Sequence, residues 1–239
     1  MPPQQTPHLR RGAAGEWCAI RKEGDLIGLG GLFGSVLFPA VCLGCRADGR
    51  GYLCSECRDK ELKWNCSRLC GCTLWTLGPY DGLLRKAIST VKTQGHKALG
   101  RELSEIASSL VKSRLVQKIS PDYVMAVPSS HQGQRFRGFS LPQMMEDRIL
   151  EVTDWVALPQ SLRRAFKSAN KSSRGLSKED RITRSKSLVQ RTETLVCGSI
   201  LIVDDVVTTG STLNRCVEQA QGLGFQEVTC LALAELVAD

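Results

Sequence analysis

Apolar side chains recur every three or four residues in several stretches of the chain. The repeat is clear across residues 83–91 and 103–115, and helix-type sequence returns across 141–152 and 212–222. This spacing places apolar residues on one face of a helix, so the sequence predicts helices in these four stretches. We expect the first of them to end near Gly95, because glycine commonly follows the last turn of a helix.

Short apolar runs of β type alternate with these helices. They cover residues 123–127, 155–158, 199–203 and 228–234. The run at 199–203 is continuous, which is typical of a strand buried on both faces of a sheet, and we expect 228–234 to be another buried strand. Strands that alternate with helices indicate an α/β fold with a parallel sheet.

The composition is that of a soluble globular protein. The chain has 239 residues, of which 42% are apolar and 23% charged, so it can bury a core of ordinary size. The longest uncharged apolar run, residues 26–41, is shorter than the roughly 20 residues that span a bilayer. The N-terminal sequence lacks the layout of a signal peptide. We therefore expect a cytoplasmic protein without a membrane span.

Positive charge is concentrated in one polar segment. The formal net charge is +8, and residues 159–191 alone hold ten Lys or Arg against two acids. Since serine and threonine are frequent there, the pattern predicts a mobile basic loop. Such a loop suits a polyphosphate or a nucleic-acid backbone, and a solvated loop without a partner is the alternative.

Cysteines gather near the N-terminus. Seven of the eleven lie between residues 42 and 72, and four of these form two C-x2-C pairs, Cys42 with Cys45 and Cys54 with Cys57. Two such pairs can complete a tetrahedron of thiolates, so they predict a structural Zn²⁺ site. The other three cysteines have irregular spacing and either add to this site, exchange with it or bind no metal: Cys66, Cys70 and Cys72.

The most informative segment follows the apolar run at 199–203. Two carboxylates, Asp204 and Asp205, precede the hydroxyl-rich turn at residues 208–212 and the predicted helix. Ligands of open α/β sheets bind at the carboxyl ends of strands, and amide groups at a helix N-terminus can hold a phosphate. Gly210 would let the backbone approach the ligand. The carboxylates could hold sugar hydroxyls directly or through a hydrated Mg²⁺.

Two other interpretations of this segment were weighed. An apolar strand that ends in two acids is also found in Walker B motifs, but the chain has no partner P-loop sequence. A purely structural interpretation makes Asp204 a helix cap and residues 208–212 an ordinary turn, which the length of the pattern disfavours.

The sequence DDVVTTGST resembles the phosphoribosyl pyrophosphate (PRPP) motif of type I phosphoribosyltransferases. The resemblance implies that Asp204 and Asp205 contact the ribose and are the candidate catalytic residues, that the following turn binds the 5′-phosphate, and that a loop after an earlier strand binds the diphosphate. The PRPP-binding residues implied in this way are Val203, Asp204, Asp205, Thr208, Thr209, Gly210, Ser211, Thr212, Pro128, Ser129, Ser130, Arg135 and Arg137.

The order of motifs is similar to that of the bacterial competence protein F (ComF) family. A cysteine module is followed by Tyr80-Asp-Gly, by Lys92-x2-Gly95, by Ala126-Val-Pro-Ser, by Arg137-Gly-Phe and by the PRPP motif. The resemblance implies a zinc ribbon at 37–79 and a phosphoribosyltransferase-like domain at 80–239, after an N-terminal extension at 1–36 that we expect to be partly disordered.

The resemblance also implies a function. ComF members are associated with natural transformation, so we expect a role in DNA uptake, with single-stranded DNA and competence proteins as partners. The alternative is an active transferase that moves ribose 5-phosphate from PRPP and Mg²⁺ to a nitrogen acceptor. Arg135, Arg137 and the basic segment are candidates for stabilising the leaving diphosphate. The family usually has Asn where this chain has Ser140, and the segment around Ser172 lacks the usual amides.

Overall fold

The computed structural model describes residues 40–49, 51–128, 137–171 and 197–237, except for the side chains of 167–171. These residues lie in one compact unit that runs from Pro39 to Asp239. Several predictions fall outside the described residues, namely those for the N-terminal extension, for Ser129, Ser130 and Arg135, and for most of the basic segment.

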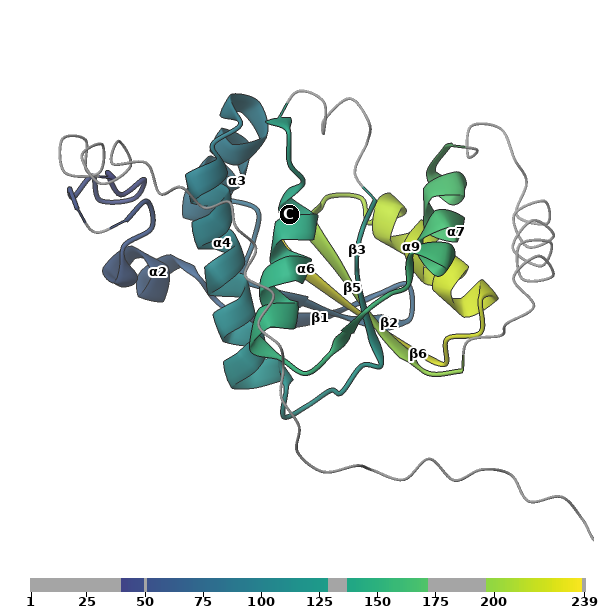
Figure 1. Ribbon diagram of the computed structural model, residues 1–239. Coiled ribbons are helices and arrows are strands. Elements are labelled where there is room, and N and C mark those ends of the chain that lie inside the picture. The colour runs from purple at the N-terminus through teal and green to yellow at the C-terminus, as the bar shows by residue number, and fades with distance from the viewer. Residues whose placement is uncertain (1–39, 50, 129–136, 172–196, 238–239) are drawn as a thin grey trace, which may run out of the picture. The chain divides into compact units, whose positions relative to one another are not determined.

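A six-stranded sheet forms the centre of this unit (Figure 1), in the order β1-β2-β6-β5-β3-β4. Its strands are β1 (Asn65–Leu69), β2 (Cys72–Thr76), β3 (Tyr123–Ala126), β4 (Val156–Ala157), β5 (Ser199–Val207) and β6 (Glu227–Glu235). β1 and β2 pair antiparallel, and every other neighbouring pair is parallel. The predicted α/β fold with a mostly parallel sheet is confirmed.

Helices cover both faces of the sheet (Figure 1). One face carries α3 (Gly82–Gln94), α4 (Lys97–Leu110), a π-helical turn (Val111–Leu115) and α6 (Leu141–Val152), and the other carries α7 (Gln160–Lys171) and α9 (Ser211–Gly222). The short helix α2 (Ser55–Glu61) precedes the sheet. The four predicted helices are therefore present, and α3 ends at Gly95 in the left-handed conformation that glycine tolerates.

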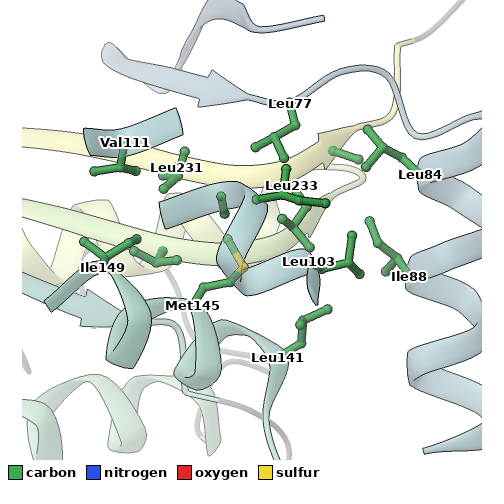
Figure 2. Packing of buried hydrophobic residues seen from close by; sticks show 14 of the residues in the cluster. Leu77, Leu84, Ile88, Leu103, Val111, Leu141, Met145, Ile149, Leu231 and Leu233 are labelled. Carbon is green, nitrogen blue, oxygen red and sulfur yellow. The ribbon is translucent and has the colours of Figure 1, made fainter. Parts of the chain in front are cut away.

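Each face of the sheet has its own apolar core, because side chains along a strand alternate between the faces. Leu201 and Val203 of β5 join the core under α3, α4 and α6, whereas Ile200 and Ile202 join the core under α7 and α9. Figure 2 shows the first core, where Leu103 and Met145 from two helices meet apolar residues of the sheet. All of these side chains are fully or almost fully buried.

The structure places the β1–β2 hairpin in the central sheet. β2 pairs with β6 from Thr73 opposite Thr229 to Thr76 opposite Ala232. The cysteines within residues 65–76 led us to predict that this stretch belongs to the cysteine module. Strand pairing between residues more than 150 positions apart makes it part of the central sheet instead. The predicted boundary at residue 79 therefore does not separate the module from the sheet.

The start of the predicted basic loop is helical. α7 covers Gln160–Lys171, and Leu162, Ala165 and Phe166 of this helix are buried against α9 and the sheet. The loop prediction was wrong here, because three apolar residues at helical spacing are enough to dock an otherwise basic helix. No helix among the described residues is long and apolar enough to cross a membrane.

Candidate functional site

Four thiols converge at the N-terminal end of the described chain. The Sγ atoms of Cys42, Cys45, Cys54 and Cys57 all lie within 4.8 Å of one another, and those of Cys45 and Cys54 are 3.7 Å apart. A tetrahedral zinc site with Zn–S bonds of about 2.3 Å has its sulfurs about 3.8 Å apart. The donor set and its spacing therefore fit Zn²⁺, as the two C-x2-C pairs predicted.

The environment of Cys42 favours its thiolate. Burial alone would raise the pKa of Cys42, but backbone N–H groups of Cys54, Cys45 and Gly44 outweigh burial and lower it to about 6. The N–H of Cys54 points at Cys42 Sγ across 3.4 Å. A hydrogen bond with the side chain of Cys54, then burial, and then hydrogen bonds with Cys45 and Cys42 raise the pKa of Cys57 to about 12. A cation is needed before all four sulfurs can be ionised together.

The cysteine turns are held against α4 by one carboxylate. Glu102 accepts hydrogen bonds from the backbone N–H of Tyr52 at 2.9 Å and of Leu53 at 2.8 Å. Leu53 is 1% exposed and belongs to the core under α3 and α4. Gly44 allows the turns to close, since a Cβ there would lie 2.7 Å from Cys57 Sγ. The position of the four thiols thus depends on the α/β domain.

The remaining cysteines of the N-terminal group lie elsewhere. Cys66 and Cys70 are exposed on the β1–β2 hairpin, and Cys72 is buried at the start of β2. Among the described residues, the cluster of potential metal ligands consists of the four C-x2-C cysteines alone.

The predicted phosphate turn connects β5 to α9. Gly210 is the N-cap of α9 with φ of +68°, and a Cβ there would lie 2.7 Å from Leu69 Cδ1. Glycine is therefore required both by the left-handed backbone and by the approach of the β1–β2 hairpin. The hydroxyl residues of the turn are exposed. Three of them, Thr208, Ser211 and Thr212, line a hollow whose other lining residues are Asp204, Val206, Val207, Gly210 and Leu213.

The two carboxylates lie within β5 and face opposite sides of the sheet. The sequence placed both at the strand end, but β5 continues to Val207 because it stays paired with β6 as far as Glu235. Asp204 lines the hollow beside α9. Asp205 faces α3, where Lys92 Nζ lies 2.8 Å from its Oδ1.

Asp204 is a strongly perturbed acid. Its residue is 9% exposed, and its Oδ1 accepts a 2.8 Å hydrogen bond from the N–H of Asp205. Burial and then the charge of Asp205 raise the pKa of Asp204 to about 7, although the hydrogen bond and Lys92 act against them. A buried carboxyl group that lines a hollow and titrates near neutral pH is a common feature of functional sites.

Other predicted PRPP residues lie near this end of the sheet. Val203 is buried in β5, and its carbonyl accepts a 2.8 Å hydrogen bond from Val127, the neighbour of Pro128. Arg137 Nη1 lies 3.3 Å from the carbonyl oxygen of Lys92. The structure thus brings Arg137 to the end of α3, next to the residue that pairs with Asp205.

A buried ion pair lies next to the end of β3. Glu146 is completely buried and forms a two-point ion pair with Arg163 of α7. Its Oε2 also accepts a 2.9 Å hydrogen bond from the N–H of Ala126, at the end of β3. Arg163 was a candidate for charge at the leaving group, and the structure assigns it to Glu146 instead.

Sequence reasoning missed Glu146 and Lys92. Glu146 is an acid on the apolar face of α6, beside Leu141, Met145 and Ile149, and an acid in such a stripe is a signal for a buried pair. Lys92 belongs to the Lys92-x2-Gly95 motif, but its ion-pair partner Asp205 is 113 residues away in the chain, so the sequence did not link the two residues.

Comparison with known proteins finds a similarity to a competence protein. No protein-family model matches the chain. The sequence is 27% identical to Competence protein F of Haemophilus influenzae over 204 residues, which cover 82% of this chain and 85% of that protein. This match confirms the resemblance to the ComF family that the order of motifs indicated.

Proposed function

Because the chain is a ComF-like protein, we propose that its α/β domain binds PRPP in the hollow at the end of β5 and acts in DNA uptake during natural transformation. The observation that carries the PRPP proposal is the join between β5 and α9. It places a buried acid, an exposed hydroxyl turn and the start of a 12-residue helix around one hollow.

The chemistry of the hollow suits a phosphorylated sugar. Gly210 caps α9 without a side-chain hydrogen bond, and the N–H of Ser211 at the start of the helix lies 3.4 Å from Thr209 Oγ1. Amides at a helix N-terminus stabilise a phosphate. Asp204 supplies an acceptor for a ribose hydroxyl, and its oxygens are hard ligands of the kind that Mg²⁺ takes.

Titration calorimetry of the full chain, loaded with Zn²⁺, tests this proposal. PRPP with Mg²⁺ should bind the unaltered protein, and binding should be lost in Asp204→Asn/Asp205→Asn. A matched control removes the same charge from two exposed acids, Asp59→Asn/Asp81→Asn, and should bind normally. Equal affinities in the two double variants would refute a role for the motif.

The proposed role in handling single-stranded DNA rests on the basic segment and on the similarity to Competence protein F. Trp155 and Phe166, which are near the basic segment in the sequence, are buried in the cores and are not available for base stacking. Binding should therefore be mostly electrostatic and fall steeply with salt.

Filter retention of labelled single strands at 50 and 200 mM salt tests the DNA role. Neutralising Arg174 and Arg181 should weaken retention and flatten its salt dependence. Neutralising Arg85 and Lys86, which are exposed on α3, is the control for net charge. Arg163 is left unchanged because it holds Glu146. Retention that responds equally to both pairs would argue against a specific surface.

Transfer of the phosphoribosyl group is the second candidate function. Bound Mg²⁺ would neutralise charge on the diphosphate, and Arg137 is placed at the same end of the sheet. Diphosphate release from PRPP in the presence of purine, pyrimidine and amine acceptors measures this activity. Binding without release under all of these conditions would leave a ligand-binding role alone.

A further inference from the structure

One ion pair joins α3 to the acidic pair of β5. Lys92 Nζ lies 2.8 Å from Asp205 Oδ1, and the two side chains are 34% and 15% exposed. Since Lys92 is in the last turn of α3 and Asp205 is near the end of β5, the pair joins the C-terminal ends of these two elements. The lysine is thus fixed in place but still reaches solvent.

The end of α3 does not need Lys92 for its own stability. A cation near a helix C-terminus is favourable because it meets the free carbonyl groups of the last turn. Here Arg137 already lies against the carbonyl of Lys92, and Gly95 ends the helix in the left-handed conformation. Two cationic side chains therefore meet at this end, where the nearby acids are Asp205 and the buried Asp204.

We infer that Lys92 is a further ligand-binding residue of the PRPP pocket, donating to the anionic oxygens of the 1-diphosphate while it holds Asp205. The inference rests on the proposed function. An ammonium group has three N–H donors, and among the described residues its hydrogen-bond acceptor is Asp205 Oδ1. Because the Lys92 side chain is 34% exposed, the ammonium group can direct its other donors to a ligand.

The faces of β5 explain why Lys92 would meet the diphosphate and not the 5′-phosphate. Asp204 and the hydroxyl turn lie on the α9 side, whereas Asp205 and Lys92 lie on the α3 side. The 5′-phosphate and the 1-diphosphate of PRPP lie at opposite ends of the ribose. A ribose placed over the two carboxylates, with its 5′-phosphate at residues 208–212, directs the diphosphate toward Lys92.

Lys92 would also share a task with the metal ion. Both a divalent cation and an ammonium group neutralise diphosphate charge beside Asp205. We therefore expect the unaltered protein to retain measurable PRPP affinity at low Mg²⁺. Removal of the lysine charge should make binding strongly dependent on the metal.

The test compares Lys92→Met, Lys92→Arg and the control Lys86→Met, an exposed lysine on the same helix. Affinities for PRPP and for ribose 5-phosphate are measured by calorimetry on the zinc-loaded full chain, from zero to 10 mM Mg²⁺. A lost hydrogen bond between charged groups weakens binding roughly 10- to 100-fold. Lys92→Met should lose this much PRPP affinity at low Mg²⁺, with ribose 5-phosphate unaffected, and Lys92→Arg should restore part of it.

The outcomes separate this inference from the proposed function. PRPP binding by Lys92→Met that equals that of Lys86→Met at every Mg²⁺ concentration overturns the inference and leaves the pocket intact. An equal loss for PRPP and ribose 5-phosphate shows that Lys92 acts only through Asp205, which also overturns it. Absence of PRPP binding by the unaltered protein overturns both. Melting curves of each variant show whether a loss of PRPP affinity comes from unfolding. If Lys92→Met is unfolded, the PRPP affinity of Lys92→Arg decides whether the lysine charge binds the ligand.

Discussion

Asp204→Asn should stabilise the ligand-free protein, and the gain should grow with pH. Asp204 is almost fully buried, and burial together with the charge of Asp205 raises its pKa to about 7 from an ordinary value of 3.8. The folded protein therefore holds this proton more tightly than the unfolded chain. The resulting stability is fully present below pH 3.8 and is lost as the pH rises through about 7.

The size of the effect follows from the two pKa values. A pKa difference of about three corresponds to about 4 kcal/mol between the protonated and the ionised folded state. An asparagine keeps an oxygen for the N–H of Asp205, which lies 2.8 Å from Asp204 Oδ1, and it never ionises. We expect Asp204→Asn to be about 4 kcal/mol more stable than the unaltered protein at pH 8, and about 2 kcal/mol more stable at pH 5.

Urea unfolding at pH 5, 6, 7 and 8, followed by tryptophan fluorescence, measures this difference. Loss of zinc at low pH affects both proteins, so only the difference between them is interpreted. Asp122→Asn is the control, because hydrogen bonds from the N–H and hydroxyl of Ser199 lower the pKa of Asp122. Its stability contribution is present above the ordinary carboxyl pKa, so its cost should be constant from pH 5 to pH 8.

A gap between Asp204→Asn and the unaltered protein that does not change between pH 5 and pH 8 would refute the reasoning. A less stable variant at pH 8 would refute it more directly. Either result would mean that the ionised Asp204 is well solvated or well paired in the folded protein. The expected result would mean that the folded protein loses stability by keeping an ionisable carboxyl group in this hollow, as functional sites often do.

Three further predictions concern the framework of the site. Arg163→Met should destabilise the protein by about 3–5 kcal/mol in urea, because it leaves the buried charge of Glu146 without its partner. Removal of Zn²⁺ by a chelator, or Cys54→Ser, should lower the melting temperature, with about one equivalent of metal per chain by elemental analysis. Gly210→Ala should lose more stability than Gly71→Ala. Both glycines have positive φ, and a side chain in that conformation costs roughly 1–2 kcal/mol. At Gly210 the added Cβ would also lie 2.7 Å from Leu69 Cδ1, whereas at Gly71 no atom lies within 4 Å of it.

Each of these has its own control. Arg163→Met combined with Glu146→Gln should recover part of the loss, because it removes the unpaired charge and keeps an acceptor for Ala126. Cys197→Ser, at an exposed cysteine outside the cluster, should bind metal normally. Leu69→Ala should reduce the difference between the two glycine variants. A protein that stays equally stable without metal would contradict the structural role of zinc.

Local patterns in the sequence determined several features of this protein. Two residues between paired cysteines predicted the four-thiol cluster, because the ligands of each pair come from one tight turn. Helical spacing predicted α3 and α6, and the run at 199–203 predicted the start of β5. The β5–α9 turn was also predicted, since Gly210 and its neighbours define a short local structure. Each of these depends on interactions between residues that are close in the chain.

Tertiary structure decided the features that depend on distant pairing. The extent of β5 is set by its pairing with β6, and this extension turns Asp204 and Asp205 to opposite faces. The β1–β2 hairpin belongs to the sheet because β2 pairs with β6, and Lys92 meets Asp205 because α3 packs on the face to which Asp205 points. The β2–β6 and Lys92–Asp205 contacts bring together residues more than 100 positions apart, and even β5 and β6 pair across 28 positions, so local spacing in the sequence does not predict these contacts. The local sequence thus put two acids and a hydroxyl-rich turn between β5 and α9, and the packing of helices on the sheet decided which charges face one another.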